Sequence, residues 1–229
     1  MADLDVPVLE PGDRHHLSRV LRLRPGDPLT VSDGAGAWRT CLFGDELEVV
    51  GEVVQQRRRE PELAVGFVPV KGDRPEWTVQ KLTELGIDRI VVLSSQRSVV
   101  RWEGDRAERH LDRLRTVARE AAMQCRRCHL PVVEGVVPVA EQAAGPGVVV
   151  RADVGGEAPS LDHRIVLVGP EGGWSDAERD LVPRAVGLAD HVLRSETAAV
   201  ATSALYTALR AQRVSPASGT TPRVNTQGD

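Results

Sequence analysis

The chain has 229 residues, 41% of them hydrophobic, and a formal net charge of −4. This length and composition predict a folded protein with one large domain or two unequal ones, and they exclude a chain too polar to build a core. The charge argues against a uniformly basic nucleic-acid binder. No apolar run reaches the roughly 18 residues that cross a bilayer, and the first residues do not resemble a signal peptide, so we expect a cytoplasmic protein without membrane contact.

The three cysteines are too few for a disulfide framework and fit a reducing compartment. Cys125 and Cys128 form a CxxC pattern followed by His129, but the chain has no second pair of ligands at the spacing of a zinc site. We therefore expect no metal site.

The N-terminal region, residues 1–65, is predicted to be a small β-rich domain. Its segments PGDPLTVSDG, AWRTCLF and ELEVVGEVV alternate apolar and polar residues between Gly, Pro and Asp breaks, which is typical of short strands. A charged connector, Arg57 to Pro61, ends this pattern. We assign residues 66–213 to a second domain and residues 214–229, which are rich in Ser, Thr, Pro and Gly, to a disordered tail.

The second domain begins with two units of a strand followed by a helix. LAVGFVPV and IDRIVVLSS have the continuous apolar character of buried strands. Asp73 with Glu76 and Asp105 with Glu108 have the spacing of capping boxes, so each pair predicts the start of a helix. Gly86 is expected to end the first helix.

Further strands and helices follow the same alternation. VVVRADV and RIVLVG are expected to be buried strands, and Ser175 with Glu178 predicts a third capped helix. HVLRS is expected to be a short last strand, before a helix from Glu196 to Gln212. Strands that alternate with helices predict an α/β domain with a largely parallel sheet.

Two segments are candidates for a binding site. VGPEGGWSDAE, residues 168–178, joins a buried strand to a capped helix through a glycine-rich loop that lets the backbone approach a ligand, although such a loop can also be a tight turn. It lacks the Lys-Ser/Thr of a phosphate loop and the GxGxxG spacing of a dinucleotide site. VLRSETAAVATSALYTALR, residues 192–210, either lies at the strand ends where open α/β sheets bind ligands or is simply an alanine-rich helix.

These segments contain GPEGG and LRSETA, and three further motifs accompany them: HHLSRVLRLRPGD at 15–27, WTVQKLTELGID at 77–88 and SSQRSVV at 94–100. In this order and spacing, the chain resembles the RsmE family of ribosomal RNA methyltransferases from about residue 10 to residue 212. The resemblance implies an α/β fold of the SPOUT class with a deep C-terminal trefoil knot, an N-terminal PUA-like β-barrel and a homodimer. It also implies S-adenosylmethionine as methyl donor and, as substrate, one uridine of 16S RNA in the small ribosomal subunit, methylated at N3.

By the same resemblance, three loops bind the methyl donor. They contain Leu167, Gly169, Pro170, Glu171, Gly172, Leu188, Ala189, Leu193, Arg194, Ser195, Thr197 and Ala198. The chain departs from the family pattern where Met123 replaces a usual Glu, Ala189 replaces a usual Gly, and His191 stands near a usual Arg. Alanine at 189 is compatible with donor binding only if this position does not need a positive φ.

Methylation at N3 of uracil makes specific chemical demands. The nitrogen becomes a nucleophile only as its proton leaves, so the site needs a proton acceptor and a cation near the charge that spreads over O2 and O4. We expect Arg97 or Arg127 to supply the cation. Glu171 or Glu196 is expected to accept the proton, unless these side chains only cap backbone N–H groups.

RNA contacts are expected from the arginine-rich clusters, because a guanidinium donates bidentately and stacks on bases, although a solvated surface explains the clusters equally well. The candidates are Arg14, His15, Arg19, Arg22, Arg24, Arg97, Arg101 and Arg127. Two other functions remain open: a SPOUT methyltransferase that acts on another RNA, and a non-catalytic RNA-binding factor for ribosome assembly. GPEGG and LRSETA argue against the second, because a pure RNA binder needs no donor pocket. The missing GxGxxG argues against a Rossmann enzyme.

Overall fold

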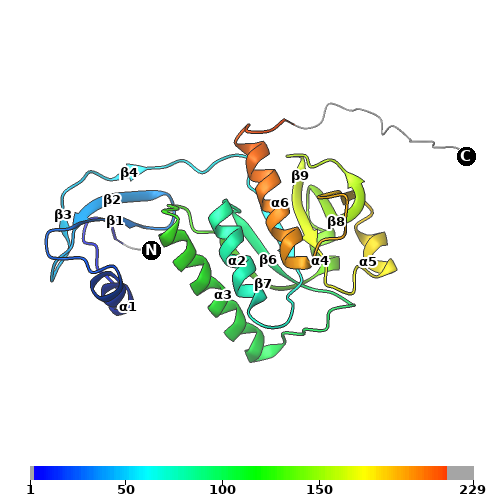
Figure 1. Ribbon diagram of the computed structural model, residues 1–229, viewed down its shortest axis with the longest axis horizontal. Coiled ribbons are helices and arrows are strands. Elements are labelled where there is room, and N and C mark those ends of the chain that lie inside the picture. The colour runs from blue at the N-terminus through cyan, green and yellow to red at the C-terminus, as the bar shows by residue number, and fades with distance from the viewer. Residues whose placement is uncertain (1–2, 216–229) are drawn as a thin grey trace, which may run out of the picture.

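The computed structural model describes residues 3–215 as a small N-terminal part joined to a larger C-terminal part (Figure 1). The elements of the N-terminal part are α1 (Pro11–His15), the π-helical turn η1 (His16–Val20), β1 (Pro28–Ser32), β2 (Ala37–Leu42), β3 (Glu48–Val49) and β4 (Val54–Gln55). They include a four-stranded antiparallel sheet in which β2 pairs with β1, β3 and β4. The predicted β-rich character of this region is confirmed.

The C-terminal part is built on a parallel sheet. Its elements are β5 (Ala64–Phe67), α2 (Arg74–Leu85), β6 (Arg89–Ser94), α3 (Gly104–Gln124), β7 (Val132–Pro138), α4 (Val139–Ala143), β8 (Val148–Glu157), β9 (His163–Val168), α5 (Asp176–Leu181), β10 (Ala185–Val186) and α6 (Ser195–Arg210). Six strands lie in the order β10-β8-β9-β5-β6-β7, and all neighbours are parallel. The predicted α/β domain with a parallel sheet is confirmed.

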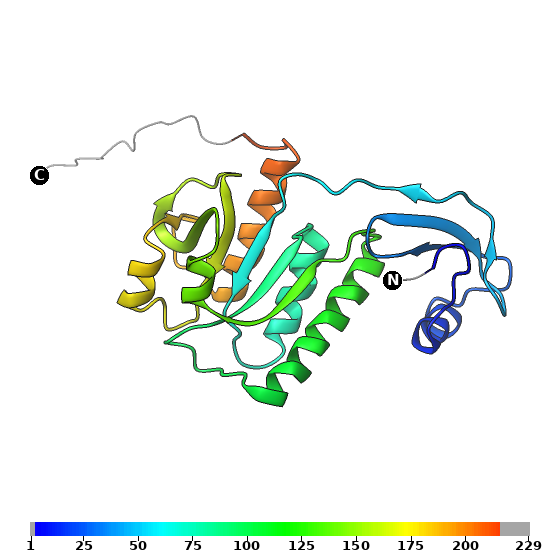
Figure 2. The same ribbon diagram turned by 180° about the vertical axis from the view of Figure 1, so that it is seen from behind.

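Helices cover both faces of this sheet (Figure 1, Figure 2). On one face α2 lies between α3 and α6, and on the other face α4 contacts α5. Successive strand residues point to opposite faces, so a strand covered on both sides is apolar throughout. In β5, Val65 and Phe67 join the core under α2, α3 and α6, whereas Ala64 packs with Ile165 and Leu167 on the other face. The continuous apolar runs in the sequence reflect this two-sided burial.

Only one of the three predicted capping boxes forms. At α5, Ser175 Oγ accepts the backbone N–H of Glu178 at 3.2 Å, and the Glu178 carboxylate accepts the backbone N–H of Ser175 at 2.9 Å. At α2 the prediction is wrong, because Asp73 has φ −90° and ψ 5°, outside the extended region typical of N-caps, and its side chain caps nothing. It is also wrong at α3, which begins at Gly104, so Asp105 already lies within the helix.

The end of the sheet also differs from the prediction. HVLRS is not a strand: residues 191–194 form an irregular loop in which Val192 is 86% exposed, and β10 lies earlier in the chain. In the pairing of β10 with β8, residues 152–156 bulge out between the two paired positions. At the end of this bulge two backbones come into close contact, because a Cβ on Gly156 would lie 2.5 Å from the carbonyl carbon of Val186 and 2.6 Å from the nitrogen of Gly187. We call this contact the glycine crossing.

The two parts of the molecule meet at a junction that includes backbone hydrogen bonds and ion pairs of Arg119. Gly36, in the loop before β2, donates its N–H to the carbonyl of Cys128 at 3.0 Å. Gly36 has φ 112°, and a Cβ there would lie 2.3 Å from the ring of His129, so the approach requires glycine. Arg119 of α3 donates to both carboxylate oxygens of Asp13 in α1, at 3.1 and 2.5 Å, and this hydrogen bonding raises the pKa of Arg119.

Two boundaries predicted from the sequence can be compared with the structure, the domain boundary and the end of the first helix of the second domain. The predicted domain boundary after residue 65 falls inside β5, which begins at Ala64. Gly86, with φ 98°, ends α2 as predicted. Residues 216–229 of the predicted disordered tail lie outside the described residues. Among the helices of residues 3–215, none is both long enough and apolar enough to cross a membrane.

Candidate active site

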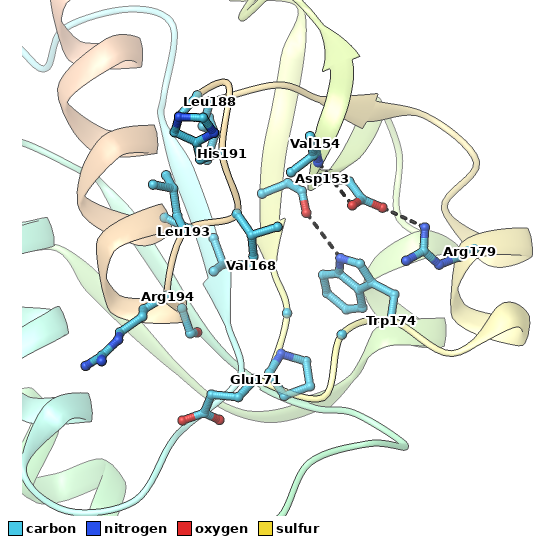
Figure 3. Close-up of a pocket in the computed structure, with 18 residues that line it drawn as sticks. Asp153, Val154, Val168, Glu171, Trp174, Arg179, Leu188, His191, Leu193 and Arg194 are labelled. Carbon is cyan, nitrogen blue, oxygen red and sulfur yellow. Dashed lines mark hydrogen bonds and ion pairs between the residues drawn. The ribbon is translucent and has the colours of Figure 1, made fainter.

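A pocket of about 330 Å³ opens at the carboxyl end of β9, beside the middle of β8 (Figure 3). Its walls come from residues 152–154, residues 168–174, residues 188–194 and the first turn of α6. Open α/β sheets commonly bind ligands at the carboxyl ends of their strands. The two segments singled out in the sequence therefore meet at one pocket.

The loop after β9 is shaped by a tryptophan that packs on a glycine. The indole N–H of Trp174 donates to the carbonyl of Ala152 at 3.3 Å and so ties this loop to the end of β8. A Cβ on Gly169 would lie 2.9 Å from the indole ring, so this position needs glycine for space. Gly173 has φ 68° and needs glycine for its backbone conformation. In Figure 3, Trp174 lies across the pocket from Arg194.

A buried carboxylate fixes this loop to its neighbour. Glu178, which is 3% exposed, accepts backbone N–H groups from Ser175 at 2.9 Å and from Gln96 at 3.0 Å. Burial by itself raises the pKa of Glu178, but the hydrogen bonds from Ser175 and Gln96 outweigh it and hold the pKa below the ordinary value. Glu178 thereby couples the glycine-rich loop to the SSQRSVV segment.

The third wall of the pocket offers backbone donors. Arg194, the N-cap residue of α6, makes no side-chain capping bond, so the first N–H groups of the helix point outward without a side-chain acceptor at that cap. In the preceding loop, Gly187 donates its N–H to Glu157 at 2.9 Å, but we find no intramolecular acceptor for the backbone N–H groups of residues 188–194 within the described chain. Such donors suit a ligand with several acceptor atoms.

Most residues expected to bind the donor do line this pocket, and three do not. The lining members are Gly169, Pro170, Glu171, Leu188, Ala189, Leu193, Arg194, Ser195 and Ala198. Leu167 is fully buried in the core, Gly172 packs against the backbone of Arg97, and Thr197 is exposed outside the pocket. Sequence reasoning missed the contribution of β8, whose residues 152–154 line the pocket from the middle of the strand.

Two of the three residues that depart from the family pattern line the pocket, and one does not. Ala189 lines the pocket and is not among the non-glycine residues with positive φ, so its side chain causes no backbone strain. His191 also lines the pocket. Met123 lies at the C-terminal end of α3, does not line the pocket and is 45% exposed.

Arg74 was not anticipated, yet it connects the two candidate proton acceptors. Its guanidinium lies 3.5 Å from a carboxylate oxygen of Glu171 and 3.9 Å from one of Glu196. Arg74 is the first residue of α2, far from both glutamates in the sequence, so only the fold reveals the cluster. A hint was available, because the first helix after a parallel strand begins at the carboxyl edge of the sheet.

Arg127, predicted to act in catalysis and RNA binding, does not line the pocket and lies at the opposite end of the sheet, beside the C-terminal end of α2. Its guanidinium donates to the carbonyls of Thr83 and Ile87, at 3.2 and 2.6 Å, and to the carboxylate of Asp88 at 2.8 Å. Arg210 donates to the same carboxylate, which is 6% exposed. Burial lowers the pKa of Arg127, and the charge of Asp88 opposes this shift. All of these contacts hold Arg127 within the protein.

The other RNA-binding candidates divide into one structural arginine and an exposed set. Arg14 donates to the carbonyls of Gly44 and Asp45, both at 2.7 Å, and lies over the ring of Phe43. These contacts give Arg14 a role in folding the N-terminal part. The exposed candidates are His15, Arg19, Arg22, Arg24, Arg97 and Arg101.

Cys125, Cys128 and His129 lie at the junction between the two parts. Within residues 3–215, the structure brings together no group of His, Cys, Asp or Glu suited to hold a metal ion. Burial raises the pKa of the Cys128 thiol.

Comparison with known families defines the class of protein. Residues 58–207 match the model of an RNA methyltransferase domain, and residues 9–50 match that of an RNA methyltransferase PUA domain. The fold, the pocket and these matches define an RNA methyltransferase with an N-terminal PUA domain.

Individual relatives narrow the assignment. The ribosomal RNA small subunit methyltransferase E of Mycobacterium bovis is 32% identical over 218 residues, covering 85% of this chain and 83% of the relative. That of Bacillus subtilis is 27% identical, with 80% and 82% covered. The crystal structure of the Neisseria gonorrhoeae enzyme bound to S-adenosyl methionine has a TM-score of 0.76 and 28% identity, with 88% and 90% covered. The chain therefore belongs to the RsmE family, as its motifs predicted.

Proposed function

We propose that this protein transfers the methyl group of S-adenosylmethionine to N3 of a uridine in 16S RNA of the small ribosomal subunit. The observation that carries this proposal is the pocket where β8 and the loops after β9 and β10 meet the start of α6. The names of the relatives support a ribosomal RNA substrate, and the Neisseria gonorrhoeae structure, which contains S-adenosyl methionine, supports the donor.

The residues of the pocket fit this donor. A volume of about 330 Å³ lies within the range of small-molecule sites. Val168, Leu188 and Leu193 offer an apolar surface for the adenine ring, and the backbone N–H groups of residues 188–194 would hold its polar atoms. Glycine at 169 lets Trp174 pack against the loop that lines the pocket. When bound, the donor supplies an electrophilic methyl group on a positively charged sulfur.

Of the two candidate proton acceptors, the contacts favour Glu196. Its Oε2 atom is buried and has no hydrogen-bond partner among the described residues, whereas the side chain of Glu171 is 53% exposed. A buried acceptor without a partner costs about 1–3 kcal/mol, so a substrate that donates a hydrogen bond to it is favoured. Glu196 lies in the first turn of α6, next to Ser195 of the pocket wall. We assign it the N3 proton of uracil.

The proposal includes a trefoil knot in the C-terminal part. The glycine crossing supports it, because the chain after β10 passes within backbone contact of residue 156 before it turns into the pocket loop. Family resemblance supplies the remainder of this argument. A knotted backbone would hold the pocket loops in place without side-chain links between them.

The proposal also includes a homodimer. Val192, 86% exposed, and Val154, 51% exposed, both line the mouth of the pocket. Apolar side chains in this position support a second subunit that covers the pocket. The exposed arginines of the N-terminal part, among them Arg19 and Arg22, would then contact the RNA backbone. The proposal also includes a cytoplasmic location, which a ribosomal substrate supports.

Mass spectrometry of ribosomal RNA nucleosides tests the proposal. The purified protein is incubated with S-adenosylmethionine and small ribosomal subunits that lack the modification, and the control lacks the donor. The expected result is 3-methyluridine, produced only with the donor present.

The other outcomes distinguish the alternatives. A different methylated nucleoside would refute uridine N3 as the target and favour another RNA substrate for the same pocket. If no methylated nucleoside forms and calorimetry shows no donor binding, the enzymatic proposal fails and an assembly factor is favoured. Sedimentation of the pure protein tests the homodimer, and a monomer would refute that part.

A further inference from the structure

Methylation at N3 requires a cation beside the uracil, and Arg127 does not supply it, because its donors are bound within the protein. Arg74 lies instead where the two walls of the pocket converge. Its guanidinium faces Glu171 of the loop after β9 at 3.5 Å and Glu196 of α6 at 3.9 Å. The charge of Arg74 is therefore placed by geometry beside the proposed proton acceptor.

The hydrogen-bonding capacity of Arg74 remains available for a ligand. Both contacts are longer than the roughly 3.2 Å limit of a good N–H···O bond, and we find no hydrogen bond of its side chain to any described residue. The side chain is 44% exposed, so a substrate can reach it. A planar guanidinium presents several donors in a fixed fork, which suits the carbonyl oxygens of a base.

We propose that Arg74 stabilises the uracil anion formed when N3 loses its proton, an inference that rests on the proposed function. Before the reaction, Arg74 balances the charges of Glu171 and Glu196. When the N3 proton moves to Glu196, the negative charge moves to O2 and O4 of the base. Arg74 keeps an anionic partner throughout, so little rearrangement accompanies the change.

The proton and electron balance of the step is complete. The N3–H bond breaks and its proton goes to Glu196 Oε2, while the electron pair stays on N3. N3 forms a bond to the methyl carbon as the carbon–sulfur bond breaks, and that electron pair stays on the now neutral sulfur. No further reactant is required.

The geometry favours Arg74 over Arg97. Arg97 touches the glycine-rich loop through its backbone, since a Cβ on Gly172 would lie 3.2 Å from its carbonyl oxygen. Its guanidinium makes no ion pair with a pocket residue within the part of the chain that the structure describes. The position of the charge of Arg97 is thus not fixed by the site.

The test compares Arg74→Ala and Arg74→Lys with wild type on two substrates, one with uridine and one with 5-fluorouridine at the target position. Fluorine makes the N3 proton more acidic, so less help is needed to form the anion. We expect Arg74→Ala to lower kcat about 10²- to 10³-fold on uridine, as loss of an oxyanion-stabilising donor does, and at least about tenfold less on 5-fluorouridine. The rise of kcat with pH should move to higher pH. Arg74→Lys should recover part of the rate.

Donor affinity, measured by calorimetry, is expected to stay within about twofold of wild type, since Arg74 does not line the donor pocket. Arg213→Ala is the matched control, because Arg213 is exposed just after the C-terminal end of α6, away from the pocket. It should leave kcat and the pH profile unchanged.

Two results would overturn the inference. One is an equal loss of rate on both substrates with an unshifted pH profile, which would indicate that Arg74 only holds the two glutamates in place. The other is a loss of donor binding, which would make Arg74 part of the donor site. Failure of the proposed function has a separate signature, because wild-type protein would then form neither 3-methyluridine from the first substrate nor 3-methyl-5-fluorouridine from the second.

Discussion

Replacing Arg127 with alanine should destabilise the C-terminal part without weakening donor binding. The change removes a charge-assisted bond to Asp88, about 1.5–3 kcal/mol, and leaves the carbonyls of Thr83 and Ile87 without their donor. Removal of one partner of a buried ion pair costs about 3–5 kcal/mol. In this variant Arg210 still pairs with Asp88, and the repulsion between Arg210 and Arg127 is removed, so the cost is smaller. We therefore expect the free energy of unfolding to fall by about 2–3 kcal/mol.

Urea unfolding followed by circular dichroism measures this loss. A decrease of about 2–3 kcal/mol corresponds to a melting temperature lower by about 4–12 °C for a protein of this size. Arg106→Ala is the control, because Arg106 is exposed on α3, and it should change stability by less than about 0.5 kcal/mol. Calorimetry of the folded variant should show the donor affinity of wild type.

The contrary result is equally clear. If Arg127→Ala unfolds at the urea concentration of wild type but loses its turnover, Arg127 acts in the reaction and the structural assignment is refuted.

Three further predictions follow from the glycines and the buried carboxylate of the C-terminal part. Gly156→Ala places a Cβ 2.5 Å from a crossing backbone and should abolish soluble folded protein, whereas Gly135→Ala, whose nearest neighbour lies at 3.6 Å, should fold; expression yield and circular dichroism decide, and a folded Gly156→Ala would refute the crossing. Gly169→Ala pushes against Trp174 and should weaken donor binding at least about tenfold by calorimetry, while unchanged affinity would remove this loop from the site. Glu178 has a pKa below its ordinary value, so the stability that its ionised form contributes is complete above roughly pH 4.3 and is lost as the pH falls through the folded pKa. Urea unfolding across this range should show that the free energy of unfolding falls less with acid in Glu178→Gln than in wild type. Equal curves for the two proteins would contradict the role of its hydrogen bonds.

The sequence predicted the parallel sheet well because burial on both faces leaves a strong local signal. Of the three capping boxes that the sequence predicted, one forms, and the reason lies in the backbone geometry before each helix. Ser175 has extended backbone angles, φ −71° and ψ 163°, that let its side chain reach back to the helix, but Asp73 does not. Residue types and spacing identify a capping box only where the backbone before the helix is extended.

The site was predicted where a single segment forms it and missed where distant segments meet. The loop with Gly169 could be recognised because its glycines are adjacent in the sequence. Arg74 and Glu171 are 97 positions apart, and no local pattern links them. The same limit applies to Arg127, since its pairing with Asp88 spans 39 positions and its charge alone does not reveal that its guanidinium is bound within the protein.

The junction between the two parts restricts how these domains can be exchanged. Gly36 must stay a glycine, because its φ is 112° and a Cβ would meet both the ring of His129 and the backbone of Gln56, and the backbone bond to Cys128 fixes where the two loops meet. Arg119 of one part and Asp13 of the other must be kept together or replaced together. An RNA-binding domain grafted from a relative would thus need the matching 128–130 segment of its own methyltransferase domain, and the two domains behave as one inherited unit rather than as separable modules.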